Sequence, residues 1–279
     1  MLISGLYIVA TPIGNLKDIS TRAIEVLSEA DIIAAEDTRV TKKLFSLLGI
    51  SVKKTFIPYE DHSEQEKFQQ IIDLINDGKS VALVSDAGSP LISDPGYKLV
   101  RECRKQNIYV TTIPGASAVI SALQLSGLPT NRFMFAGFIP NKDKARIEIF
   151  TELKSINTTL VLYETAIRLE KSLEALQKIM PEREISIVRE ITKLYEETIS
   201  GTIAEVLEKL KANPVKGGIV IVIAPPAEKD IQDVDLNTVL TEELKHCSLK
   251  VAVKNITERY GFKRNDVYEM ALQIKNQSL

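Results

Sequence analysis

The stretch SDAGSPLISDPG, residues Ser85–Gly96, follows the apolar run Val81–Val84 directly. It contains two glycines, two prolines and two aspartates in twelve residues. An ordinary strand-to-helix connection needs only about two to six residues. Glycine lets a backbone approach a ligand closely, and proline fixes turns. We therefore expect a buried strand followed by a loop that holds a small molecule, with a plain connection as the alternative.

Apolar runs alternate with helical spacing on both sides of this stretch. Strands are predicted at Leu6–Thr11, Ile32–Ala35, Val52–Ile57, Val81–Val84 and Ile108–Ile113. This alternation is typical of a parallel sheet covered by helices on both faces. Ligands bind outside the carboxyl ends of such strands. The loops expected there are polar or rich in glycine and proline: Thr11–Asn15, Glu36–Arg39, Tyr59–His62, Asp86–Gly96 and Pro114–Ala118.

The pattern changes after Leu128–Pro129. Further strands are predicted at Phe133–Phe138, Thr159–Tyr163, Glu184–Val188 and Gly218–Ala224, with an antiparallel piece at Glu196–Gly201. A polar, linker-like segment follows Pro225–Pro226, and short helices fill the remainder. We predict an α/β protein with two α/β domains, residues 1–114 and 115–226, an interdomain cleft, and a small C-terminal helical module at 236–279.

Composition sets limits on the function. The chain has 279 residues and a net charge of −2, which argues against binding nucleic acid through bulk charge but permits a local basic groove. Cys103 and Cys247 show no metal or disulfide spacing, which suits a reducing cytoplasm. The apolar N-terminus is short and lacks a basic start, so we interpret it as a strand. We expect a cytoplasmic protein with no metal and no membrane segment.

Single signatures do not identify an activity. Gly78–Ser80 resembles the end of a P-loop, but Asp73 stands where its first glycine should be. No GxGxxG follows the first strand, and HExxH and CxxC are absent. No nucleophile elbow supports a triad of Ser117, His62 and Asp86, and His62 is better explained as a helix-entry residue.

Three segments that occur in this order along the chain are more specific than any single signature. They are ATPIGNL (10–16), SDAGSPLISDPG (85–96) and PGASA (114–118). Together they resemble the tetrapyrrole-methylase superfamily of S-adenosylmethionine-dependent methyltransferases. Within it, AAEDTR (34–39), LYET…RL (162–169) and VREITKLYEE (188–197) resemble the branch of 16S rRNA cytidine-2′-O-methyltransferases. The similarity spans residues 5–225, and residues 250–272 resemble the small helical module of that branch.

The resemblance implies S-adenosylmethionine as cofactor, 16S rRNA in the small ribosomal subunit as partner, and a homodimer. The target would be cytidine 1402 in the decoding centre. The cofactor contacts carried over are Pro12, Ala87, Gly88, Ser89, Ile92, Ser117, Ala118, Glu164 and Ile191. The chain departs from the small-molecule branch where AGSP, residues 87–90, replaces GGDP. A tetrapyrrole methylase and a non-catalytic module that binds S-adenosylmethionine or RNA are the alternatives.

A ribose hydroxyl is a poor nucleophile, so a base or a cation should assist it. Glu36 and Arg39 rank first, because polar residues directly after a buried strand are costly unless they are used. The wider set also includes Asp37, His62, Asp86, Glu164 and Glu190. For RNA phosphates we expect contacts from Lys142, Lys144, Arg146, Lys263 and Arg264, with a solvated charged face as the alternative.

Overall fold

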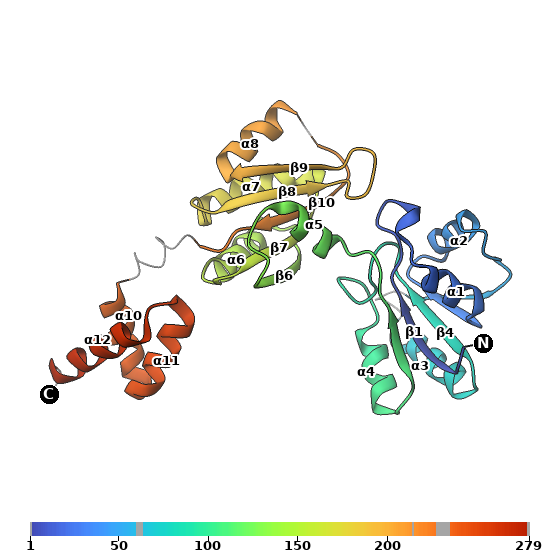
Figure 1. The fold of residues 1–279 in the computed structure, drawn as a ribbon, viewed down its shortest axis with the longest axis horizontal. Helices are drawn as coiled ribbons and strands as arrows, with labels where there is room; N and C mark the ends of the chain where they lie inside the picture. Colours follow the sequence, from blue (N-terminus) through green and yellow to red (C-terminus); the bar gives the residue numbers. More distant parts are fainter. Residues whose placement is uncertain (1, 60–63, 214, 227–234, 278–279) are drawn as a thin grey trace. The chain divides into compact units, whose positions relative to one another are not determined.

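A computed structural model describes residues 2–59, 64–213, 215–226 and 235–277 (Figure 1). The chain divides into two compact units. The first contains Met1–Leu125 and Val188–Thr198, and the second contains Ser126–Ile187 and Ile199–Leu279. Helix α5 (Ala118–Ser126) thus groups mostly with the first unit, although the domain boundary predicted at residue 114 precedes it.

The first unit is built on a five-stranded sheet in the order β3-β2-β4-β1-β5. Its strands are β1 (Gly5–Val9), β2 (Ile32–Ala35), β3 (Thr55–Pro58), β4 (Ser80–Val84) and β5 (Val110–Ile113). Every pairing is parallel, with Leu6 opposite both Val81 and Val110. The predicted parallel sheet is confirmed, with β3 and β5 starting later than the sequence suggested.

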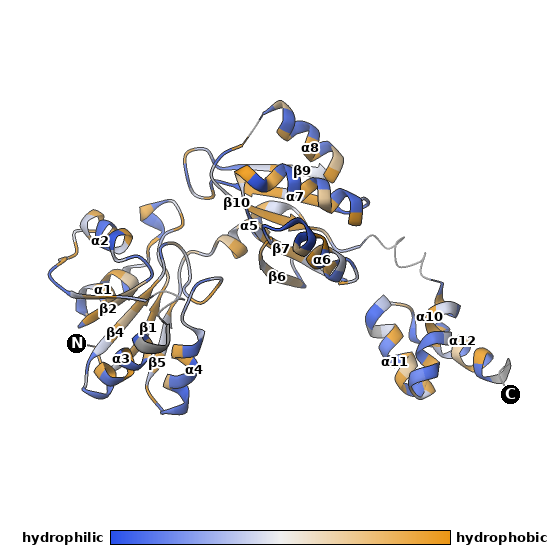
Figure 2. Cartoon of the chain, turned by 180° about the vertical axis from the view of Figure 1, so that it is seen from behind, coloured by the Kyte–Doolittle hydropathy of each residue, from blue (hydrophilic) through white to orange (hydrophobic). Residues whose placement is uncertain are grey.

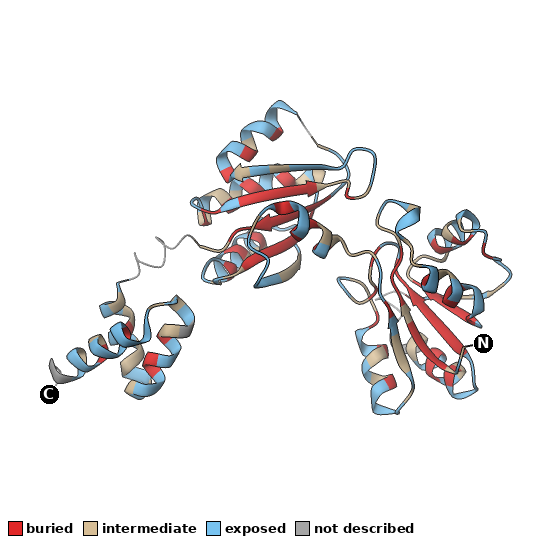
Figure 3. Ribbon diagram, viewed as in Figure 1, coloured by how far each residue is buried: buried red, intermediate tan, exposed pale blue. Residues whose placement is uncertain are grey.

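Helices cover both faces of this sheet, because successive strand residues point to opposite sides. Tyr7 and Val9 share a core cluster with residues of α1 (Thr21–Glu29) and α2 (Thr38–Leu47). Leu6 belongs to a second cluster, with residues of α3 (Glu64–Asn76) and α4 (Tyr97–Lys105). The central strands β1, β2 and β4 are buried almost throughout, whereas the edge strands β3 and β5 are partly exposed (Figure 3).

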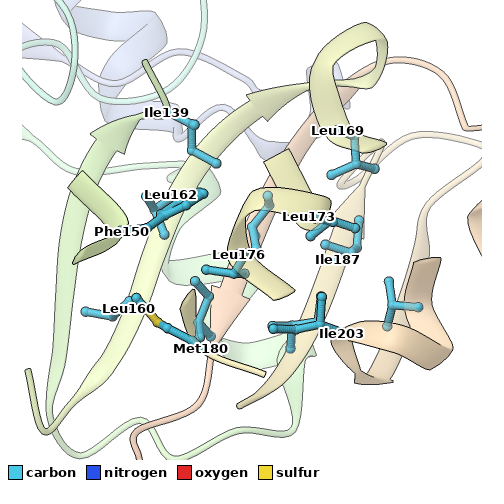
Figure 4. Packing of buried hydrophobic residues seen from close by; sticks show 14 of the residues in the cluster. Ile139, Phe150, Leu160, Leu162, Leu169, Leu173, Leu176, Met180, Ile187 and Ile203 are labelled. Atoms are coloured by element: carbon cyan, nitrogen blue, oxygen red, sulfur yellow. The ribbon is translucent and has the colours of Figure 1, made fainter. Parts of the chain in front are cut away.

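The second unit contains a mixed sheet in the order β6-β7-β10-β8-β9. Its strands are β6 (Phe133–Phe138), β7 (Thr159–Thr165), β8 (Glu184–Arg189), β9 (Glu197–Thr202) and β10 (Gly218–Ile223). β6 runs parallel to β7, and β10 runs antiparallel to it. The helices are α6 (Asp143–Lys154), α7 (Ala166–Ile179) and α8 (Ile203–Ala212). Phe150, Leu160 and Leu173 lie in the core between sheet and helices (Figure 4).

Three helices form the C-terminal segment: α10 (Leu236–His246), α11 (Leu249–Tyr260) and α12 (Arg264–Gln277). Their apolar faces enclose a small core that includes Leu240, Ile256 and Val267. Gly261 ends α11 in the left-handed conformation that glycine adopts at least cost. Hydrophobic residues on these helices alternate with polar ones, as expected for amphipathic helices (Figure 2).

The described residues contain neither a membrane-spanning helix nor a metal-binding cluster. None of the helices in those ranges is long and apolar enough to cross a bilayer. No group of three or more His, Cys, Asp or Glu side chains in the same part of the chain is placed to hold a metal ion.

Candidate active site

The first sheet has a topological switch point between β1 and β4. From β1 the chain passes through α1 to β2, on one side, and from β4 it passes through α4 to β5, on the other. Adjacent parallel strands whose connections leave in opposite directions mark the ligand site of open α/β sheets. The loops after these two strands contain the predicted cofactor contacts Pro12, Ala87, Gly88, Ser89 and Ile92.

A pair of backbone hydrogen bonds joins these two loops. The Thr11 amide donates to the Gly88 carbonyl over 2.8 Å, and the Gly88 amide donates to the Thr11 carbonyl over 3.1 Å. The buried Thr11 hydroxyl also donates to the Ser85 carbonyl over 3.2 Å. Gly88 has φ +82°, and a Cβ there would lie 3.3 Å from Ile13 Cγ2. Conformation and space therefore both favour glycine at residue 88.

The third predicted loop, PGASA, packs against the second. Ser89 Oγ donates to the Ala116 carbonyl over 3.5 Å. A Cβ added at Gly115 would lie 3.0 Å from Ala10 Cβ, so this turn fits closely against the end of β1. Ser117 and Ala118 follow at the start of α5 and are partly buried. The sequence therefore correctly predicted that the three loops share one edge of the sheet.

Segment Val188–Thr198 places Ile191 beside the first loop. This segment groups with the first unit, and Ile191 is buried. The Asn15 amide donates to Thr192 Oγ1 over 3.0 Å. All the predicted cofactor contacts except Glu164 consequently lie in one compact unit.

Glu164 is bound within the second unit. Its fully buried carboxylate accepts from Arg168 Nη2 over 2.6 Å, from the Thr165 amide over 2.7 Å and from the Ser172 hydroxyl. Both carboxylate oxygens therefore hold the start of α7 against β7. These three bonds give the carboxylate a structural role within the second unit.

The residues ranked first for catalysis belong to a network at the ends of β2 and β4. The Asp86 amide donates to Glu36 Oε2 over 3.2 Å, and the Asp37 amide donates to Asp86 Oδ1 over 3.0 Å. Arg39 donates to both oxygens of Asp37, from Nη2 over 2.6 Å and from Nε over 3.0 Å. The network fixes the start of the Asp86 loop relative to β2.

The pKa values of the two aspartates in this network, Asp37 and Asp86, are shifted in opposite directions. Hydrogen bonds from the Arg39 side chain and amide lower the pKa of Asp37 to about 2. Burial raises the pKa of Asp86, and the charge of Asp37 contributes to that rise. Carboxyl groups whose pKa values are driven apart are a recurring feature of acid–base sites. The sequence ranking did not put Asp86 first, although it lies only two positions after the buried strand β4.

The predicted RNA contacts differ in their exposure. Lys142, Lys144, Lys263 and Arg264 are exposed. Arg146 is only 4% exposed, and its guanidinium donates to Asp143 Oδ1 and the Asn141 carbonyl, each over 2.9 Å. Arg146 therefore fixes the turn before α6 and does not present a free guanidinium to a phosphate. His62 lies outside the described residues.

Comparison with known proteins identifies the family. Residues 5–207 match the family model of Tetrapyrrole (Corrin/Porphyrin) Methylases, and residues 230–275 match that of the RsmI C-terminal HTH domain. Proteins named ribosomal RNA small subunit methyltransferase I are similar over nearly the whole chain. The one from Rickettsia prowazekii is 45% identical, over 96% of this chain and 94% of its own. The one from Erythrobacter litoralis is 50% identical, over 97% and 95%.

The chain belongs to the tetrapyrrole methylase family, in its ribosomal RNA small subunit methyltransferase I branch. Solved structures of tetrapyrrole methylases have the same fold. Uroporphyrin-III C-methyltransferase from Thermus thermophilus, solved in complex with S-adenosyl homocysteine, superposes with a TM-score of 0.53 at 17% identity. The match covers 79% of this chain and 97% of that enzyme.

Proposed function

We propose that this tetrapyrrole methylase transfers the methyl group of S-adenosylmethionine to the 2′-hydroxyl of a cytidine in 16S rRNA. Cytidine 1402 is the target that the family resemblance suggests. The observation that carries the proposal is the joining of the Thr11–Asn15, Ser85–Gly96 and Pro114–Ala118 loops at the switch point. The near full-length similarity to rRNA methyltransferases supports the choice of substrate.

The joined loops suit a ligand held mainly by backbone groups. Gly88 keeps space open beside Ile13, and Ala87 adds only a methyl group at an exposed position. Ile92 is 46% exposed although it is a large apolar residue, so it can cover the apolar face of a nucleoside. We assign Pro12, Ala87–Ser89, Ile92, Ser117, Ala118 and Ile191 to the cofactor. We assign Glu164 a structural role.

S-adenosylmethionine supplies an electrophilic methyl group on a sulfonium sulfur. The ribose O2′ forms a bond to that carbon while the carbon–sulfur bond breaks, and the hydroxyl proton passes to a base. We assign Glu36 and Arg39 to activation of the hydroxyl, together with Asp86, whose backbone amide binds Glu36. The raised pKa of Asp86 favours proton uptake by that carboxylate.

Exposed cations provide local phosphate contacts on a chain with net charge −2. We assign Lys142 and Lys144 before and within α6, and Lys263 and Arg264 at the start of α12, to the RNA backbone. The match of residues 230–275 to an HTH domain supports a nucleic-acid role for this segment. A cytoplasmic homodimer is the assembly that the family resemblance suggests, and sedimentation of the purified protein tests the dimer.

Labelled S-adenosylmethionine, offered with either small ribosomal subunits or a precorrin, tests the function. Label in 16S rRNA is the expected result. Label in the tetrapyrrole would replace the proposal by small-molecule methylation. Label in neither, with binding of S-adenosylmethionine retained, would indicate a binding module.

A further inference from the structure

Loop 190–196 lies directly on the Pro12–Asn15 loop. A Cβ added at Gly14 would lie 2.6 Å from Lys193 Cγ, 2.8 Å from the Ile191 carbonyl oxygen and 2.9 Å from Thr192 Oγ1. Gly14 is not one of the glycines with positive φ. Close contact with the opposite loop, and not a special backbone conformation, therefore requires glycine here.

Internal bonds hold loop 190–196 in one shape. The Thr192 amide donates to Glu196 Oε2 over 2.6 Å, and the Lys193 amide donates to the Glu190 carbonyl over 2.9 Å. Lys193 Nζ also lies 3.0 Å from Glu190 Oε1. Glu190 and Thr192 have φ +49° and +64°, which is strained for residues with side chains and unusual for a β-branched one. Such strain persists where surrounding contacts over-determine it, and it concentrates at functional sites.

The Pro12–Asn15 loop is fastened at both ends. Thr11 is paired with Gly88 at its start, and the Asn15 amide binds the Thr192 hydroxyl at its end. The Asn15 side chain is engaged separately, because it accepts from the Lys17 amide over 3.1 Å. The Thr192 hydroxyl is thus a specific anchor for the loop that carries Pro12.

We propose that Thr192 is a positioning residue for the methyl donor, and that loop 190–196 clamps the Pro12–Asn15 loop in its binding conformation. The inference rests on the proposed function, since it assumes that this loop contacts S-adenosylmethionine. A loop fixed before binding loses less conformational freedom when the ligand arrives, so the Thr192 hydroxyl raises affinity through the bond to Asn15 and not through a contact of its own with the ligand.

Calorimetric titration of the full chain with S-adenosylhomocysteine tests the clamp. Thr192→Val removes the hydroxyl and keeps the shape, so we expect the Kd to rise about fivefold, the cost of one hydrogen bond. Gly14→Ala forces the loops apart, and we expect a rise of about tenfold or more. Thr192→Ser retains the hydroxyl and should bind like the wild type. Thr151→Val, which removes the hydroxyl bond to Ile147 in α6, is the matched control and should leave the Kd unchanged.

Two further measurements separate positioning from general damage. KM for S-adenosylmethionine should rise in Thr192→Val with kcat unchanged. Hydrogen exchange should show loss of protection at the Asn15 amide in that variant, while the strands of the first sheet stay protected. Hydrogen exchange also shows whether Thr192→Val binds poorly only because it is unfolded. In that case Thr192→Ser keeps the test open, because the clamp requires this variant to restore both the protection of the Asn15 amide and the wild-type Kd.

Failure of the inference and failure of the function are distinguishable. If the wild type does not bind S-adenosylhomocysteine, the proposed function is wrong. If the wild type binds, and folded Thr192→Val and Gly14→Ala bind equally well, the clamp is overturned and the proposed function stands.

Discussion

Thr11 and Gly88 exchange both of their backbone hydrogen bonds, over 2.8 and 3.1 Å. The two residues follow adjacent strands, β1 and β4, whose connections leave the sheet in opposite directions. The pair therefore ties together the two loops that border the switch point. The candidate site takes its shape from backbone contacts at this point, which is why small residues and glycine dominate it.

A side chain at Gly88 should weaken cofactor binding. In Gly88→Val, a β-branched residue must adopt φ +82° and contact Ile13, at a cost of about 1–3 kcal/mol. We expect the Kd for S-adenosylhomocysteine to rise at least tenfold in calorimetric titration. Gly78→Val is the control, because Gly78 has φ +86° with nothing within 4 Å of an added Cβ. It should cost stability but not affinity, and equal Kd values for the two variants would contradict the assigned site.

Glu164 should matter for stability and not for the cofactor. Glu164→Ala leaves the partly exposed Arg168 guanidinium and the buried Ser172 hydroxyl without their acceptor, which should destabilise the second unit by about 1–3 kcal/mol. Urea unfolding, followed by hydrogen exchange in β7 and α7, measures the loss. Glu164→Gln should bind S-adenosylhomocysteine like the wild type. A large rise in Kd with unchanged stability would restore the predicted cofactor contact.

Asp86 gives a pH-dependent stability with a defined sign. Its pKa in the folded protein is raised above the ordinary 3.8, mainly by burial, so the folded state binds this proton more tightly than the unfolded chain. The associated stability is present below that ordinary value and is lost as pH rises through the folded pKa. Asp86→Asn keeps an oxygen for the Asp37 amide. It should therefore raise the thermal midpoint near neutral pH, with a gain in the free energy of unfolding of less than about 1 kcal/mol because solvent screens the group.

The control for this prediction is the same thermal unfolding measurement in acidic solution. The gain from Asp86→Asn should vanish below pH 3.8, where the wild-type carboxyl is protonated in both states. A gain that is the same at all pH values would show that the substitution acts through packing instead of through the charge.

Lys263 and Arg264 should contribute to RNA binding through phosphates. Replacing both with alanine should weaken binding to the small ribosomal subunit at low salt. It should also reduce the slope of log K against log salt by about 1.5, as expected for two lost phosphate contacts. Lys209 and Lys211 on α8, replaced together, change the net charge equally and should leave the slope unchanged. Identical slopes for both double variants and the wild type would remove α12 from the RNA interface.

The sequence predicted what depends on local pattern. Alternating strands and helices place the Asp86–Gly96 and Pro114–Ala118 loops at one edge, because parallel strands share the direction of their carboxyl ends. Pattern could not show that Arg146 turns back onto Asp143, since charge alone does not separate a buried arginine from an exposed one.

Contacts between residues far apart in the sequence could not be predicted from local pattern either. Asn15 and Thr192 are 177 positions apart, and only the fold brings them together. The motif assigned Glu164 to the cofactor. In the fold, its carboxylate binds the side chains of Arg168 and Ser172, which lie four and eight positions further along the chain. Helical spacing from the end of β7 could have indicated that arrangement.

The most direct test is to locate the methyl group on 16S rRNA. Small subunits that lack the modification are incubated with the purified protein and S-adenosylmethionine, and the RNA is digested to nucleosides and fragments for mass spectrometry. The proposed function requires one new methyl group on the ribose of a cytidine in the decoding centre, absent when the cofactor is omitted. Methylation on a base, or no methylation of the subunit by a protein that binds S-adenosylmethionine, would contradict it.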